Sequence, residues 1–164
     1  MEPVGRSSDD VLVIGLGSPI MTDDAVGLKI AEAIEKMDLP NVGTVQEAIG
    51  GLDIIPLMLG HRKVIVVDAI QTKACDPGTI IIFNPEDFEP TVVNASAHEM
   101  NLATAIKIGR QFDPKGMPEI IRFVAVEVSD ILTVSETMTD AVVKALPDAV
   151  KTVSDLIREF QTSI

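Results

Sequence analysis

Two aspartates and one histidine in this sequence are of the residue types, and at the places between elements, that could form a divalent transition-metal site. Asp24 lies in a turn after a β-branched run, with Asp23 as its neighbour, and Asp68 closes the aliphatic run at residues 63–69. His98 stands near the start of a helical stretch. Imidazole and carboxylate ligands suit zinc, nickel or cobalt, and three protein ligands leave one coordination position open for water or substrate. The same carboxylates would also suit general acid–base chemistry.

Each of these residues also has a purely structural interpretation. An aspartate at a helix start is usually a cap, so Asp23 or Asp24 is expected to cap the helix that follows it. A strand-end aspartate such as Asp68 often only accepts backbone hydrogen bonds, and a lone histidine is more often a surface residue than a ligand. Taken together, the three residues still indicate a metal or acid–base site, and their types and spacing do not choose between these two.

Other chemistries have weaker support in the sequence. Cys75 lies in a loop without an obvious base to activate its thiol, and Ser18 lacks the G-x-S-x-G context of a nucleophile elbow. Gly15 and Gly17 suggest a dinucleotide-binding loop, but that fingerprint needs glycine or alanine at the position held by Ile20. A nucleotide- or flavin-binding α/β domain is therefore kept as an alternative.

The elements that must position these residues follow from the hydrophobic pattern. Strands are predicted at residues 10–17, 42–48, 63–69, 79–83 and 120–128, and helices after residue 23 and at 52–59, 96–111 and 137–160. Nearly all-apolar strands that alternate with helices favour a three-layer α/β/α sandwich around a mostly parallel sheet. The 79–83 strand follows its predecessor too closely for a helical crossover, so we expect it to be antiparallel.

This architecture explains how distant residues would meet. Ligands of open α/β sheets bind beyond the carboxyl ends of the strands, and Asp24, Asp68 and His98 are all expected at that edge. If Ser96 caps its helix, His98 lies near the second helical position, where the macrodipole favours a neutral, metal-binding imidazole. His61 precedes its strand, so we expect it at the opposite edge.

Composition narrows the class of protein further. The chain has 164 residues, 46% of them hydrophobic, and a net charge of −12. So acidic a surface repels phosphate backbones, and no apolar run is long enough for membrane insertion, so neither nucleic acid nor membrane is an expected partner. One cysteine and no recognisable secretory leader favour a cytoplasmic protein. We expect residues 1–10 to be frayed and residues 11–162 to form a single domain.

Four short motifs occur in order along nearly the whole chain. They are Gly15-Leu16-Gly17, Thr22-Asp23-Asp24-Ala25-Val26-Gly27, Val66-Val67-Asp68-Ala69 and Ser96-Ala97-His98-Glu99-Met100. Each is weak alone, but together at these intervals they are specific, and the chain resembles the [NiFe]-hydrogenase maturation endopeptidases. This resemblance implies a five-stranded sheet of order 2-1-3-5-4 with the fourth strand antiparallel, which agrees with the pattern above.

The resemblance also implies an activity and a site. Family members remove a C-terminal extension from the precursor of the hydrogenase large subunit once nickel has been inserted. Their metal-binding residues match Asp24, Asp68 and His98, which are then also the expected catalytic residues. Nickel is expected to be presented by the precursor, with other divalent transition metals substituting in vitro. A non-catalytic nickel checkpoint that binds the same precursor is the alternative, and the oligomeric state is left open.

The chain departs from the family pattern at four places. Ser18 replaces the usual asparagine after the second glycine, and Ala25 replaces the glycine after the acidic pair. The family's Asp-Gly-Gly-Thr segment is replaced by Gln-Glu-Ala-Ile at residues 46–49. The frequent Glu/Gln-Pro after the fifth strand is here Glu127-Val128. These changes leave the three expected ligands intact and bear on the choice of precursor.

Overall fold

The computed structural model describes the backbone of residues 10–88 and 97–162, and the side chains of all of these except residues 88 and 97–100. The strands are β1 (Val11–Leu16), β2 (Val42–Glu47), β3 (Lys63–Ile70), β4 (Ile80–Phe83) and β5 (Ile120–Glu127). The α-helices are α1 (Val26–Lys36), α2 (Ile55–Met58), α3 (Ala97–Phe112) and α4 (Asp140–Thr162). Single 3-10 turns are η1 (Thr22–Ala25), η2 (Gly51–Ile54) and η3 (Pro85–Phe88).

The sequence predicted these elements closely. The expected helix at residues 52–59 is a 3-10 turn followed by a short α-helix, and the last helix begins at Asp140 rather than at residue 137. Of the segment 1–10 that was expected to be frayed, all but Asp10 lies outside the described residues. In the part of the chain that is described, no helix is both long and apolar enough to cross a membrane.

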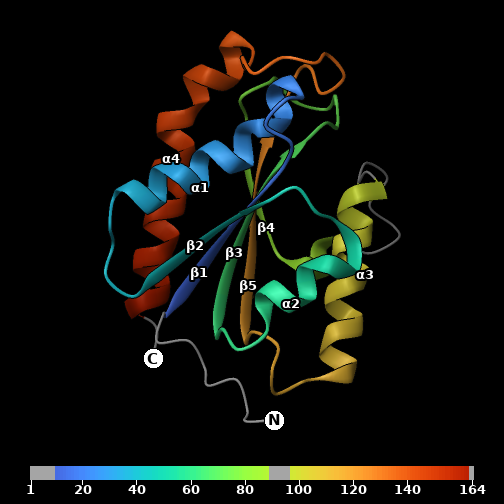
Figure 1. The fold of residues 1–164 in the computed structure, drawn as a ribbon, viewed down its shortest axis with the longest axis vertical. Coiled ribbons are helices and arrows are strands. Elements are labelled where there is room, and N and C mark those ends of the chain that lie inside the picture. Colours follow the sequence, from blue (N-terminus) through green and yellow to red (C-terminus); the bar gives the residue numbers. More distant parts are fainter. Residues whose placement is uncertain (1–9, 89–96, 163–164) are drawn as a thin grey trace.

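The predicted sheet is confirmed in order and direction. The strands lie in the order β2-β1-β3-β5-β4; the β4–β5 pair is antiparallel and the other three pairs of the described strands are parallel. Helices α1 and α4 cover one face of the sheet, and α2 and α3 cover the other (Figure 1). The strands β1 and β3 are therefore buried on both faces, which explains their nearly uninterrupted aliphatic sequence.

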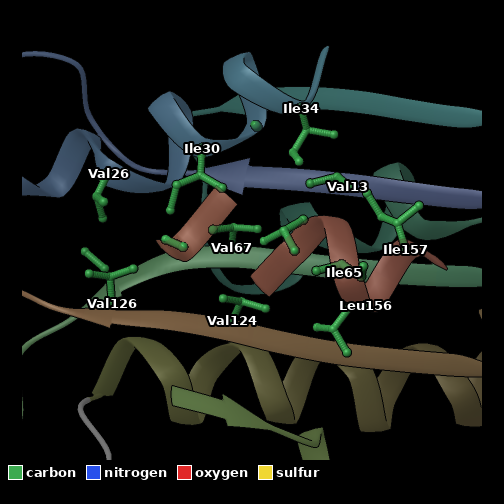
Figure 2. Packing of buried hydrophobic residues seen from close by; sticks show 14 of the residues in the cluster. Val13, Val26, Ile30, Ile34, Ile65, Val67, Val124, Val126, Leu156 and Ile157 are labelled. Atoms are coloured by element: carbon green, nitrogen blue, oxygen red, sulfur yellow. The ribbon is translucent and has the colours of Figure 1, made fainter. Parts of the chain in front are cut away.

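Side-chain alternation divides the core into two layers. Val13, Ile65 and Val67 point to one face, where Ile30 of α1 and Ile157 of α4 pack against them (Figure 2). The intervening residues of the same strands point to the face covered by α2 and α3. Because successive residues of a strand point to opposite faces, Asp68 shares a face with Val64 and Val66, and therefore with α3.

Gly15 in β1 and Gly27 in α1 allow the helix to pack closely against the sheet. A Cβ on Gly15 would lie 2.4 Å from the carbonyl oxygen of Gly27, and a Cβ on Gly27 would lie 2.3 Å from that of Leu16 and 2.5 Å from that of Val67. Helix α1 therefore rests directly on the backbone of β1 and β3. This close approach accounts for Gly15, one of the two glycines that suggested a dinucleotide-binding loop, without a bound nucleotide.

We expect Gly27→Ala to destabilise the protein strongly. The added methyl would collide with two carbonyl groups of rigid central strands, so α1 would have to move away from the sheet. Overpacking of a core typically costs about 1–3 kcal/mol, and contact with backbone places this site at the upper end. Urea unfolding of Gly27→Ala beside the exposed-site control Lys29→Ala checks this, and equal unfolding free energies would contradict it.

Candidate functional site

A cavity of about 380 Å³ lies where the parallel strands end. Its walls come from the turn after β1, the segment after β2, the end of β3 and the segment after β5. Asp24 and Asp68 line it together with the apolar side chains of Ile49, Val128 and Ile131. The structure thus brings two of the three predicted site residues, 44 positions apart in the sequence, to one cavity at the predicted edge of the sheet.

The tight turn before α1 holds Asp24 in place. Gly17 has φ +148°, and a Cβ there would lie 1.9 Å from the carbonyl oxygen of Asp24, so only glycine fits. The turn folds back far enough for the Ser18 N–H to donate to Asp24 Oδ2 over 3.0 Å. Asp24 is half-buried, with one oxygen held by the backbone and its side chain on the cavity wall.

Asp68 is more deeply buried than Asp24. It is 6% exposed, and its Oδ1 accepts a hydrogen bond of 2.8 Å from the N–H of Ala69. The flanking strands β1 and β5 fix the backbone of β3, with Asp68 opposite Ala125 in the register. A carboxylate in this position is rigid, shielded from bulk water on most sides and still part of the cavity wall.

The position of His98 is described by its backbone only. It is the second residue of α3, which runs antiparallel to the following strand β5, so the helix begins on the carboxyl side of the sheet (Figure 1). Asp68 points to the face that α3 covers. The His98 side chain and Ser96 lie outside the described residues, and the three-residue site stays a prediction. Among the side chains that are described, no three His, Cys, Asp or Glu form a metal-binding group.

The prediction that Asp23 or Asp24 caps α1 is wrong. The helix has no side-chain cap, and Asp23 instead lies fully buried, facing the β5–α4 connection. Its Oδ2 accepts from the N–H groups of Ser129 and Asp130, both over 3.0 Å. Its Oδ1 accepts from the Thr139 N–H over 2.7 Å, and the Thr139 hydroxyl donates to the same carboxylate. Asp23 therefore fixes the loop that forms one wall of the cavity.

Further contacts hold this loop against the turn that carries Asp24. Thr22 has φ +54°, a strained conformation for a β-branched residue that costs about 1–3 kcal/mol. Its N–H donates to Ser135 O over 3.0 Å and its hydroxyl donates to Thr133 O over 2.5 Å, which offsets the strain. The strain is stored directly beside the candidate site.

The loop also contains its own carboxylate turn. Hydrogen bonding holds the pKa of the Asp130 carboxyl below its usual range. The largest effect comes from the Thr133 side chain, and the backbone N–H groups of Thr133 and Leu132 add to it. Because the folded-state pKa is lowered, the carboxylate stabilises the loop at neutral pH, and this contribution is lost as the pH falls through the lowered value.

A further buried carboxylate, Glu127, lies on the opposite side of the strand ends. It is 1% exposed, and its Oε2 accepts from the Thr72 N–H over 2.9 Å. The Thr72 hydroxyl and, over 3.4 Å, the Cys75 thiol donate to its Oε1. The thiol thus contacts a carboxylate rather than the imidazole or amine that activates a cysteine nucleophile. His61 precedes β3 at the opposite edge, as predicted, with its N–H bound to Met58 O.

Comparison with known proteins gives a consistent result. The family model "HycI: Hydrogenase maturation protease" matches residues 28–156 of the chain. The chain is 32% identical over 111 residues to the hydrogenase 2 maturation protease of Escherichia coli, an alignment that spans 64% of this chain and 68% of that protein.

Solved structures show the same similarity. The hydrogenase maturating endopeptidase HybD of Escherichia coli superposes with a TM-score of 0.76 at 26% identity, over 91% of this chain and 92% of that one. The HybD protease of Thermococcus kodakarensis superposes with a TM-score of 0.73 at 23% identity, over 90% and 98%, and supports the fold alone.

Proposed function

The chain belongs to the hydrogenase maturation protease family, and we propose that it is an endopeptidase that removes the C-terminal extension from the precursor of a [NiFe]-hydrogenase large subunit. One observation carries this proposal beyond the family. Asp24 and Asp68 line a single cavity at the carboxyl edge of the sheet, where open α/β folds bind their ligands.

Nickel carried by the precursor is part of the proposed substrate. Asp24, Asp68 and His98 offer two carboxylates and an imidazole, a donor set suited to nickel. They would complete the coordination of an ion whose other ligands are thiolates of the precursor. A precursor without nickel has no such ion, so the enzyme would bind the correctly loaded precursor selectively.

The chemical step has two possible routes at this site. Nickel would polarise the scissile carbonyl or lower the pKa of a bound water. Alternatively, Asp68 or Asp24 takes a proton from the attacking water as general base. The first route uses both carboxylates as nickel ligands and the second uses one of them as the base, and neither uses Cys75.

The surroundings of the cavity suit a macromolecular substrate. On the β5–α4 connection, Ile131 lines the cavity, and Leu132 and Val134 are 83% and 74% exposed. Ile20, in the turn that is hydrogen-bonded to Ser135, is 50% exposed. Aliphatic side chains presented to water on a firmly held loop favour contact with another protein over a small polar ligand.

Incubation with nickel-loaded precursor, followed by mass spectrometry, tests the proposal. We expect the precursor to be shortened at one bond, and a nickel-free precursor to stay intact. Binding without shortening would favour the non-catalytic checkpoint instead. Saturable nucleotide binding with no dependence on metal would favour an unrelated α/β domain.

We also expect the isolated protein to bind nickel, zinc or cadmium weakly, and less well in acid. Three ligands without a thiolate form an incomplete shell, and a histidine must lose its proton to bind a metal ion. Binding should therefore weaken as the solution becomes more acidic, and His98→Ala should remove most of this pH dependence. Calorimetry at two pH values checks this, with His61→Ala as the matched control. Tight binding that survives His98→Ala would place the ion elsewhere.

A further inference from the structure

The strand β2 is the outermost strand on one side of the sheet, and among the described residues it pairs only with β1 (Figure 1). The hydrogen bonds at its two ends fix which backbone groups face inward. Asn41 O accepts from Val11 N over 3.3 Å, and Glu47 O accepts from Gly17 N over 3.2 Å. In a parallel pair, the N–H and C=O of one residue point to the same neighbour, and successive residues alternate. Odd-numbered residues of β2 therefore face β1.

The even-numbered residues Val42, Thr44 and Gln46 direct their backbone N–H and C=O groups away from β1. Within the described ranges, no residue donates to or accepts from these groups. Edge strands are usually protected against pairing by proline, by lysine or by a covering element. The sequence of β2, VGTVQE, contains neither residue, and its side chains are half-buried or exposed.

The free edge leads directly into the candidate site. The strand ends at Glu47, and the next two residues, Ala48 and Ile49, line the cavity together with Asp24 and Asp68. Six residues at about 3.3 Å each give an edge of about 20 Å. An extended chain lying along β2 would thus be directed into the cavity that holds both carboxylates.

We propose that the edge of β2 binds the precursor segment that contains the bond to be cut, as an added β-strand. This inference rests on the proposed function for the identity of the bound peptide. A row of alternating backbone donors and acceptors is complementary to another extended backbone, and it binds with little regard to side chains. The added strand would bring the scissile bond to Asp24 and Asp68 and hold it in a fixed register.

The charges along this edge restrict the bound segment. Between Met37 and Arg62 the chain contains Asp38, Glu47 and Asp53 and no lysine or arginine. Glu47 and Asp53 are exposed at the end of β2 and just after it. A neutral or cationic segment is therefore favoured over an acidic one.

A proline at one outward-facing position of β2 tests the proposal. Gln46→Pro removes an outward N–H and places a ring on the free edge, while the exposed side chain and the ladder to β1 lose little. We expect Gln46→Pro to weaken binding of fluorescently labelled, nickel-loaded precursor about tenfold, and Gln46→Thr to leave it unchanged. Fluorescence anisotropy measures binding whether or not cleavage follows. A failure of β2 to bind the precursor can therefore be distinguished from a failure of the proposed endopeptidase function. Thermal unfolding shows that each variant is folded.

A second measurement needs no variant. Synthetic peptides of the precursor's C-terminal segment, N-methylated at one residue at a time, compete with the labelled precursor. We expect N-methylation to weaken competition at alternate positions, because every second N–H of an added strand faces β2. Unchanged precursor affinity in folded Gln46→Pro, or competition without alternation, would overturn the proposal. So would a dimer of this chain that Gln46→Pro dissociates, because β2 would then pair with a second copy.

Discussion

Asp68→Asn is expected to abolish processing of the nickel-loaded precursor while leaving the fold intact. The amide has nearly the size of the carboxylate, and its oxygen still accepts the hydrogen bond from the Ala69 N–H. The substitution removes the negative charge from a position that is 6% exposed and lines the cavity. Loss of either a general base or a charged nickel ligand costs at least about 100-fold in rate. Single-turnover cleavage followed by mass spectrometry measures this loss.

Matched substitutions decide whether the loss belongs to the site. Asp24→Asn should reduce processing to a similar extent, because Asp24 lines the same cavity. His61→Ala, at the opposite edge of the sheet, and Cys75→Ser should process the precursor at close to the normal rate. Normal cleavage by folded Asp68→Asn would exclude Asp68 from the mechanism, and an inactive Cys75→Ser would replace it with a cysteine mechanism.

The sheet and the general position of the candidate carboxylates were predictable because each buried strand leaves a local hydrophobic pattern in the sequence. Each central strand, buried on both faces, is a short aliphatic run, and the residue that ends such a run must lie at an edge of the sheet. The aliphatic run at residues 63–69 therefore predicts that Asp68 lies near the carboxyl end of its strand, and β3, which ends at Ile70, has it there. The same rule places His61 at the amino end of β3. The short connection before β4 predicts that β4 is antiparallel to its neighbour, as it is.

The partners of buried carboxylates were not predictable in this way. Asp23 and Asp24 are adjacent and of one type, yet Asp23 is fully buried against residues 129–139 and Asp24 lines the cavity. The difference depends on a loop more than 100 positions away, which leaves no periodic trace in the sequence. Likewise, nothing local to Glu127 shows that Thr72 donates to it across the strand ends.

The structure shows where the departures from the family pattern lie. Ser18 and Val128, which replace the usual asparagine and proline, both line the cavity. Ala48 and Ile49, from the segment that replaces Asp-Gly-Gly-Thr, line it as well. Three of the four departures thus contribute residues to the cavity wall, which Asp24 and Asp68 also line, and Ala25 does not. We infer that these three departures adjust which precursor fits, with the carboxylates unchanged.

Asp23→Ala is expected to destabilise the protein far more than Asp24→Ala. The Asp23 carboxylate accepts from three backbone N–H groups and from the Thr139 hydroxyl, all inside the protein. Hydrogen bonds to a charged group contribute about 1.5–3 kcal/mol each, and buried donors left without an acceptor add a further cost. Asp23→Ala also removes the cost of keeping a charge away from water, which offsets part of this loss. We therefore expect the free energy of unfolding to fall by about 4 kcal/mol, a large part of the typical stability of a small domain.

Asp24 provides the control for this prediction within the same turn. It is half-buried, and among the described residues it accepts one hydrogen bond, from the Ser18 N–H, so Asp24→Ala should lower stability by about 1 kcal/mol. Asp23→Asn should also destabilise, because its amide group cannot accept from both sets of donors at once. Urea unfolding monitored by circular dichroism measures all three variants. Stability that is lost equally in Asp23→Ala and Asp24→Ala would show that the buried carboxylate does not hold the loop, and the cavity wall formed by residues 128–131 would then need another support.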